Sequence, residues 1–275
     1  MNTLKTKVTQ YLQNKNQVEA TALALYKEVI KALELGTIRI AEKIDEKWVV
    51  NGWIKTVILW GFKYGKLITL PGSVWNYCDK DTMPVKQITP NDRIRMVPGG
   101  SAIRCGSYVA SGTIIMPPAY VNIGAYVDTG CMIDSHALVG SCAQLGKNVH
   151  LSAASQIGGV LEPIGAMPVI VEDNVFIGGN CGIYEGTIVK AGAVLGSGVV
   201  LNASTPVFDS IAGVFIKKTN THPLIIPENA VVVAGSRPMN SGFGKENNMH
   251  IYCPIIIKYK DAKTSTATAL EDMLR

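Results

Sequence analysis

The chain has 275 residues, a formal net charge of +5 and a hydrophobic content of 47%. This length suits one large or two small domains, and the absence of any run of 18 apolar residues argues against a membrane partner. The basic residues are scattered rather than gathered in a run, which argues against nucleic acid but suits an anionic small-molecule substrate.

Residues 1–98 are expected to form an α/β cap domain. Apolar residues recur at spacings of three or four across 4–35, which predicts helices, and Gly36 suits the end of the second helix. Residues 37–44 alternate as in a strand. Residues 48–62 begin as a strand and continue as an apolar helix.

An internal repeat of six residues then runs through 103–205, interrupted by eight extra residues at 163–170. A period of six fits neither a helix nor an alternating strand, but it fits a prism wound from short strands, with three hexads to a coil. Each hexad begins with an aliphatic residue: Ile103, Val109, Ile115, Val121, Val127, Ile133, Val139, Leu145, Leu151, Ile157, Val171, Ile177, Ile183, Val189, Leu195 and Leu201.

The other hexad positions predict how the corners close. The residue four places after the aliphatic is mostly small, and the residue three places after it is often Gly or Asn, which tolerate positive φ. Backbone hydrogen bonds would join coils stacked about 4.8 Å apart. We therefore predict a mainly β fold, with a parallel β-helix over 99–235 and loops at 163–170 and 209–223.

The period fades after Leu201, and residues 236–275 are expected to form a small C-terminal segment. Residues 226–232 read as a last partial coil. Beyond them we expect a loop at 236–248, a strand at 250–259 and a short helix at 264–274.

The six cysteines form no C-x-x-C pair, and several occupy the small corner positions of the repeat. Free buried thiols in a reducing compartment are the expected state. The first 17 residues lack the apolar segment of a signal peptide, so the sequence predicts a cytoplasmic protein.

Several segments are more specific than the repeat requires. They are YVNIGAYVD at 120–128, VGSCAQLGKNVHLS at 139–152, IGGVLEP at 157–163, RIAEK at 39–43, WVVNGWIK at 48–55, RMVP at 95–98 and KDAKT at 260–264. Together they resemble the tetrahydrodipicolinate N-succinyltransferase family, in the same order and over nearly the whole chain.

This resemblance implies a left-handed β-helix and a homotrimer with active sites between neighbouring subunits. It also implies succinyl-CoA as co-substrate, no metal and no permanently bound cofactor. The reaction would transfer a succinyl group to the nitrogen of tetrahydrodipicolinate, in lysine and diaminopimelate biosynthesis.

The resemblance also assigns acceptor-binding residues. Asp134 matches a family aspartate implicated in substrate binding and as a possible base, although a corner aspartate can simply bond turn amides, as expected for Asp128. Arg95 matches a substrate-binding arginine whose fork of donors suits a carboxylate. Arg104 matches a further family arginine and ranks below Arg95.

Glu185 matches a family glutamate, but the hexad count separates it from Asp134. The two residues are seven hexads apart, which is two and one-third coils. This spacing places the two carboxylates on different faces and about 11 Å apart along the axis. Glu185 would therefore meet a neighbour's ligand or be structural. A second carboxylate known in some family members falls at Gly182 here, which puts a two-carboxylate mechanism in doubt.

The CoA phosphates need cations, and Lys258 and Lys260 are our candidates, with Lys217 and Lys218 also considered. The chain departs from common family residues at positions close to the expected site. These departures, which leave the choice of succinyl or acetyl donor open, are Ser135, His136, Ala153, Ala154, Asn180, Gly182 and Ser265.

Three other interpretations compete. A hexapeptide acyltransferase could use acetyl-CoA, or another amine or hydroxyl acceptor, with His136 as base. A metal site would need three convergent ligands from His136, His150, His222 and His250, but the first two differ in hexad phase. A non-catalytic scaffold would not need the specific segments at 120–163.

Overall fold

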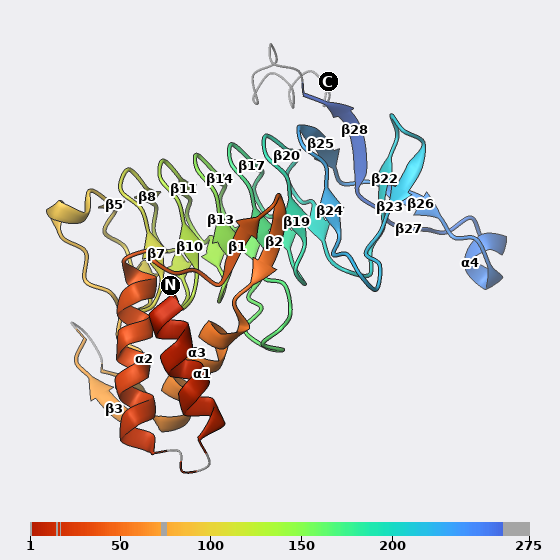
Figure 1. The fold of residues 1–275 in the computed structure, drawn as a ribbon. Coiled ribbons are helices and arrows are strands. Elements are labelled where there is room, and N and C mark those ends of the chain that lie inside the picture. The colour runs from red at the N-terminus through yellow and green to blue at the C-terminus, as the bar shows by residue number, and fades with distance from the viewer. Residues whose placement is uncertain (1, 15, 17, 73–75, 261–275) are drawn as a thin grey trace.

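The computed structural model describes residues 2–14, 16, 18–72 and 76–260. A helical N-terminal domain lies beside a long column of short strands (Figure 1). The predicted helix at 264–274 and the departure at Ser265 lie outside the described residues.

In the described residues, the N-terminal domain contains three α-helices and two β-hairpins. Its elements are α1 Asn2–Gln13, α2 Glu19–Glu34, β1 Ala41–Ile44, β2 Lys47–Val50, α3 Gly52–Tyr64, β3 Leu67–Leu70 and β4 Tyr77–Lys80. The predicted helices are confirmed, and Gly36, with φ of 67°, ends α2. The Thr37 N–H bonds the Ala32 carbonyl and the Gly36 N–H bonds the Leu33 carbonyl, as in a Schellman cap.

The predicted strand at 37–44 is shorter in the structure, where β1 begins only at Ala41. Ile38 and Ile40 precede it and are buried, with Ile40 accepting a hydrogen bond from the Asn51 backbone. The alternating pattern in this segment therefore reflects packing against the helices as well as strand pairing.

The repeat forms three parallel sheets, which we name A, B and C. Sheet A contains β6 Ala102–Ile103, β9 Tyr120–Val121, β12 Leu138–Val139, β15 Gln156–Ile157, β18 Gly182–Ile183 and β21 Val200–Leu201. Sheet B contains β7 Tyr108–Val109, β10 Tyr126–Val127, β13 Gln144–Leu145, β16 Ile170–Val171, β19 Ile188–Val189 and β24 Ile225–Ile226.

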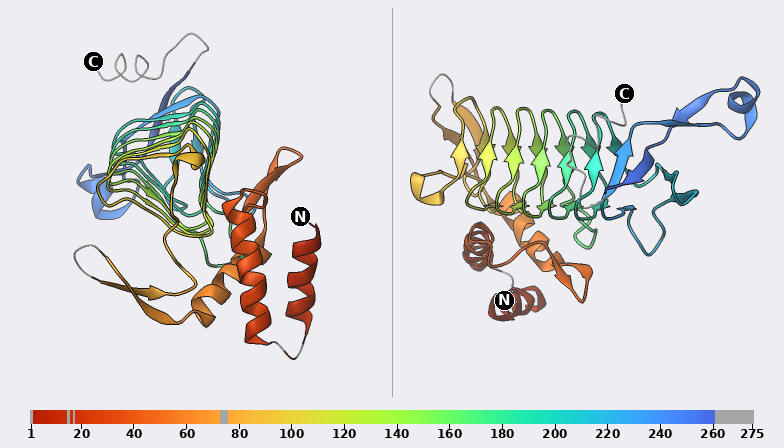
Figure 2. Two further views of the ribbon diagram at one scale, coloured as in Figure 1. Left: turned by 90° about the vertical axis from the view of Figure 1, so that its left-hand side faces the viewer. Right: turned by 90° about the horizontal axis from the view of Figure 1, so that it is seen from above.

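Sheet C is the longest. Its strands, in spatial order, are β5 Arg95–Met96, β8 Ile114–Ile115, β11 Met132–Ile133, β14 His150–Leu151, β17 Phe176–Ile177, β20 Val194–Leu195, β25 Ala230–Val233, β28 Ile255–Tyr259, β22 Val207–Asp209 and β23 Val214–Ile216. Each coil visits sheets A, B and C in turn, and the coils stack as a prism (Figure 2). The fold is a left-handed parallel β-helix, as predicted.

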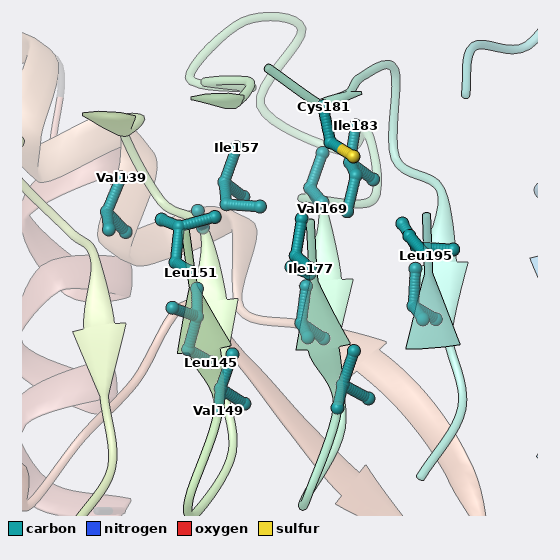
Figure 3. Packing of buried hydrophobic residues seen from close by; sticks show 14 of the residues in the cluster. Val139, Leu145, Val149, Leu151, Ile157, Val169, Ile177, Cys181, Ile183 and Leu195 are labelled. Carbon is teal, nitrogen blue, oxygen red and sulfur yellow. The ribbon is translucent and has the colours of Figure 1, made fainter. Parts of the chain in front are cut away.

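The sixteen hexad aliphatics all lie in the prism core, and none is more than 5% exposed. Figure 3 shows several of them, with Leu145, Leu151 and Ile157 pointing into the space between the sheets. Residues 18 apart pair between coils, for example Ile133 with Ile115 and with Leu151. The small corner residues are buried, and the ten Gly and Asn corners have positive φ, namely Gly106, Gly112, Gly124, Gly130, Asn148, Asn174, Asn180, Gly186, Gly192 and Gly198.

The interruption of the repeat is a loop of residues 158–169 between β15 and β16, so Ile170, predicted as its last residue, belongs to β16. Pairing resumes with Leu145 opposite Val171. The fully buried Lys55 of α3 donates from Nζ to the Ala166 carbonyl at 2.7 Å, and burial lowers the pKa of this lysine. Helix α3 thereby fixes the position of the loop.

The C-terminal region is more ordered than predicted. Residues 209–223 were expected to be a loop, but β22 and β23 pair as an antiparallel hairpin at their start. The expected loop at 236–248 contains β26 Ser236–Pro238 and the short α4 Gly242–Glu246. The single strand expected at 250–259 is two strands, β27 His250–Tyr252 and β28, interrupted at Pro254 because proline has no N–H to donate.

Together β26, α4 and β27 form a projection, residues 236–252, that we call the C-terminal arm (Figures 1 and 2). Within the described part of the chain, no helix is long and apolar enough to cross a bilayer.

All six cysteines are free, and all but the exposed Cys78 are buried. Burial raises the pKa of Cys105 to about 11 and those of Cys131 and Cys142 to about 12. These thiols therefore stay protonated near neutral pH and pack as small apolar groups.

Ala154 offers a stability prediction, because it occupies a corner with φ of 58°. An L-residue with a Cβ is disfavoured there, so Ala154→Gly is expected to raise the free energy of unfolding by about 1 kcal/mol. Urea denaturation would measure it, with Ala153→Gly as control, since position 153 is not among the positive-φ residues. Equal effects of the two substitutions would contradict the strain argument.

Candidate functional site

Asp134 lies at the corner that follows β11 of sheet C and leads to β12 of sheet A. Its Oδ1 accepts a hydrogen bond from the Ser135 N–H at 2.8 Å, and its own N–H is held by the Leu151 carbonyl. Oδ2 has no hydrogen-bond partner among the described residues. The half-buried carboxylate therefore keeps one oxygen available for a substrate proton.

Arg95 is in β5 of the same sheet, two strand spacings from β11 and so about 10 Å from it along the axis. Its side chain is exposed, and it forms no ion pair with any of the residues that the structure describes. The structure thus places Arg95 on the sheet that carries Asp134, with its guanidinium available to an anion.

Arg104 lies elsewhere, at the corner between sheets A and B that follows β6. Its guanidinium pairs with Asp79 of β4, and its Nε donates to the Met83 carbonyl at 3.5 Å. The side chain is 17% exposed. Arg104 therefore ties the β3–β4 hairpin to the first coil and is not brought close to Asp134.

Glu185 follows β18 at a corner between sheets A and B, whereas Asp134 follows sheet C. Asp134 leads into β12, and β12 is two coils away from β18, the strand before Glu185. This spacing confirms the predicted separation of the two carboxylates within one chain. The exposed Glu185 accepts a hydrogen bond from the Ala203 N–H at 2.7 Å.

Glu185 also lines a cavity of about 1030 Å³ that we call the outer cavity. It lies between the 158–169 loop and residues 218–223. Its apolar surface includes Leu138, Val160 and Met167, while Glu162, Lys218 and His222 bring charge and polarity. Its size and mixed lining suit an extended ligand with polar groups, such as an acyl thioester arm.

Gly182, where the resemblance implied a second carboxylate in some family members, is covered by a neighbouring side chain. A Cβ added at Gly182 would lie 2.5 Å from Cε2 of Tyr184, so the tyrosine ring occupies the space above this glycine. The Tyr184 hydroxyl donates to Gln156 Oε1 at 3.0 Å, and the ring lines the outer cavity. The structure thus places the phenol of Tyr184 over Gly182, the position to which the resemblance assigned a second carboxylate.

Sequence reasoning missed Tyr184 and Gln156. The available signal was the pair Gly158 and Gly182, since a Cβ at Gly158 would also lie only 2.7 Å from the Tyr184 ring. Two glycines on neighbouring coils make room for one aromatic ring.

The candidate lysines are dispersed. Lys218 lines the outer cavity, whereas Lys217 lines a second cavity beside the C-terminal arm. Lys258 is in β28 opposite Val231, and the Lys260 N–H bonds the Asn229 carbonyl at 2.7 Å. Lys258 and Lys260 therefore lie at the end of the β-helix and outside the outer cavity.

The four histidines also lie apart. His136 is exposed at the Asp134 corner with φ of 61°, His150 packs against the tilted ring of Phe176 in sheet C, and His222 bonds Thr221. His250 contacts Ser236 in the C-terminal arm. In the described ranges, no three His, Cys, Asp or Glu side chains converge to hold a metal ion.

Comparison with known proteins identifies the family. Residues 3–64 match the model of the tetrahydrodipicolinate N-succinyltransferase N-terminal region, and residues 168–203 match the hexapeptide repeat of succinyl-transferase. Three similar proteins are each named 2,3,4,5-tetrahydropyridine-2,6-dicarboxylate N-succinyltransferase.

The similarity extends over most of both chains in each case. The protein from Azoarcus sp. (strain BH72) is 44% identical over 90% of this chain and 88% of its own length. The one from Pasteurella multocida (strain Pm70) is 42% identical over 94% of this chain and 91% of its own length. The one from Blochmanniella pennsylvanica (strain BPEN) is 40% identical over 97% of this chain and 94% of its own length. The chain therefore belongs to the tetrahydrodipicolinate N-succinyltransferase family.

Proposed function

We propose that the protein transfers a succinyl group from succinyl-CoA to the nitrogen of tetrahydrodipicolinate, a step of lysine and diaminopimelate biosynthesis. The observation that carries this proposal is the similarity, over nine-tenths of the chain, to relatives named for this reaction. The free oxygen of Asp134 and the large outer cavity supply features that such a reaction needs.

The acceptor reacts as an amine. Water opens the cyclic imine to give the amino ketone, and its nitrogen attacks the thioester carbonyl. The carbon–sulfur bond breaks, CoA leaves as the thiol, and the product is N-succinyl-2-amino-6-oxopimelate. Asp134 is our candidate base, with Oδ2 taking the proton lost by nitrogen.

We assign Arg95 to a carboxylate of the acceptor, since its exposed guanidinium lies on the sheet of Asp134. Arg104 is the weaker candidate for the same task, because Asp79 already neutralises it. Glu185 would contribute to the acceptor site formed around Asp134 of a neighbouring copy, because the corners that carry Glu185 and Asp134 are far apart within one chain.

A homotrimer would provide that neighbour. The N-terminal domain packs on sheet B, where Ala41 contacts Ile170 and Ile188. Ile114, Met132 and Phe176, half-buried on sheet C, can instead be covered by another copy.

Succinyl-CoA would enter as a co-substrate, with no permanently bound cofactor, and the outer cavity would hold its acyl-thioester arm near Lys218. Lys258 and Lys260 remain predictions for its phosphates. A cytoplasmic location follows from this biosynthetic role.

The decisive experiment measures thiol release with tetrahydrodipicolinate and either succinyl-CoA or acetyl-CoA. We expect release with succinyl-CoA and much slower release with acetyl-CoA. Faster release with acetyl-CoA would reassign the donor, and no release with either thioester would refute the acyltransferase assignment.

A further inference from the structure

A smaller cavity of about 330 Å³ lies between the β22–β23 hairpin and the C-terminal arm, and we call it the arm cavity. It contains two cationic side chains and no carboxylate. The residues around it are Pro206, Phe215, Lys217, Arg237, Pro238 and Asn240.

Arg237 is the central feature of this cavity. It lies in β26, opposite Ile251 of β27, and its Nε is buried without a hydrogen-bond partner. Throughout the part of the chain that the structure describes, its guanidinium has no ion-pair partner. Because Nε is covered by protein, a ligand would meet the other donors of this guanidinium, and a cation without a partner in a cavity lined by no carboxylate favours an anionic ligand.

Lys217 adds a second positive charge from a different element. Its Nζ lies 5.7 Å from the ring centroid of Phe215, which in turn packs on Phe208. No acidic side chain of the described residues pairs with it. The aromatic contact holds the ammonium beside the cavity without neutralising it.

The rest of the lining also suits an oxyanion. Pro206 and Pro238 offer no backbone N–H, so the strong donors of the cavity are the side chains of Arg237, Lys217 and Asn240. A guanidinium fork binds two oxygens of one phosphate, and an ammonium supplies a point charge to a third.

We propose that the arm cavity binds a phosphate group. Two sources carry this chemistry: inorganic phosphate, and the phosphate-bearing end of the CoA co-substrate. Only the second source rests on the proposed function. The cavity lies beyond β25, which is already four strand spacings, about 19 Å, from the Asp134 strand β11. The bound group would thus contribute to binding and take no part in the chemical step.

Isothermal titration of the full-length protein tests the proposal without requiring turnover. The probes are inorganic phosphate and adenosine 3′,5′-bisphosphate, which carries the 3′-phosphate found in CoA. Arg237→Gln is expected to weaken binding of the true ligand about tenfold or more, since hydrogen bonds to charged groups are lost. Lys217→Gln, on a separate element, should weaken it in the same direction, and Arg237→Lys should recover only part of the loss.

The matched control is Lys245→Gln, which removes one positive charge from the exposed face of the arm and away from the cavity. It should leave both affinities unchanged. Loss confined to adenosine 3′,5′-bisphosphate identifies CoA as the source, and loss of inorganic phosphate binding alone identifies free phosphate.

Unchanged binding of both probes in Arg237→Gln and Lys217→Gln would overturn the proposal. The proposal would also be overturned if Arg237→Gln eluted as a smaller oligomer on size exclusion while its phosphate binding was unchanged. In that case, the partner of Arg237 would be a carboxylate of a second copy of the chain. Failure of succinyl transfer in the thiol-release assay refutes the proposed function and leaves the titration with inorganic phosphate to decide this site.

Discussion

Asp134→Asn is expected to lower kcat/KM for succinyl transfer by about 10²–10⁴-fold, the usual contribution of a general base. The amide keeps the shape of the side chain, and its oxygen can still accept the Ser135 N–H that fixes the corner. It cannot take a proton from the attacking amine. Steady-state kinetics measure the loss, and thermal melting should show little change.

The matched control is Asp128→Asn, because Asp128 accepts the N–H of Thr129 at 2.7 Å in the same way but lies at the corner after β10. It should retain nearly full activity. His136→Ala separates the competing assignment: activity that survives Asp134→Asn but is lost in His136→Ala would make the histidine the base.

Leu145→Ala is expected to lower the free energy of unfolding by about 2–5 kcal/mol, the range found for buried leucines. Leu145 is fully buried in sheet B, between Val127 on one coil and Val171 on the next. A cavity there removes contacts with both neighbouring coils, and each coil packs mainly on its neighbours. Urea denaturation at one fixed protein concentration measures the change, since assembly would add to the apparent stability.

Leu67→Ala is the control, because Leu67 in β3 is 67% exposed and should change stability by less than about 0.5 kcal/mol. A similar loss in the two variants would mean that burial at Leu145 is not what stabilises the prism. A loss in Leu145→Ala below about 1 kcal/mol would mean that the coils close over the gap.

The sequence predicts the prism well because its constraints are local. One inward aliphatic such as Ile133 and one small corner residue such as Ala137 recur in each hexad, and both are buried as the period requires. The coil count also predicts that Asp134 and Glu185 lie on different faces, and their strands β11 and β18 belong to different sheets. Periodicity is enough where every contact is with the next coil.

Contacts between distant segments were beyond this reasoning. The Arg39 Cζ lies 3.8 Å from the ring centroid of Tyr126. The Arg39 Nε donates to Oε1 of Gln144, which is 105 residues away in the sequence. The β22–β23 hairpin is joined to β28 through Tyr259, whose hydroxyl donates to Asp209 at 2.5 Å. Neither contact follows a period, so the docking of the N-terminal domain and the C-terminal pairing needed the structure.

The candidate site likewise contains some residues that the sequence predicts and others that only the structure reveals. Asp134 and Arg95 are predictions that rest on the family resemblance, whereas Tyr184 was not predicted, because its position depends on a ring folding back over Gly158 and Gly182. Arg237 lies in a segment that carries no repeat. The proposal for Arg237 depends on the lack of a partner among the described residues, which only the structure shows.

The loop at 158–169 shows how such a scaffold can change during evolution. Eight residues added at one corner leave Leu145 opposite Val171 and every later coil in register. Insertions and deletions at corners can therefore reshape the wall of the outer cavity without disturbing the columns that hold the fold together. Substrate preference and folding can then diversify under separate selection, with the corners free to vary and the inward positions constrained.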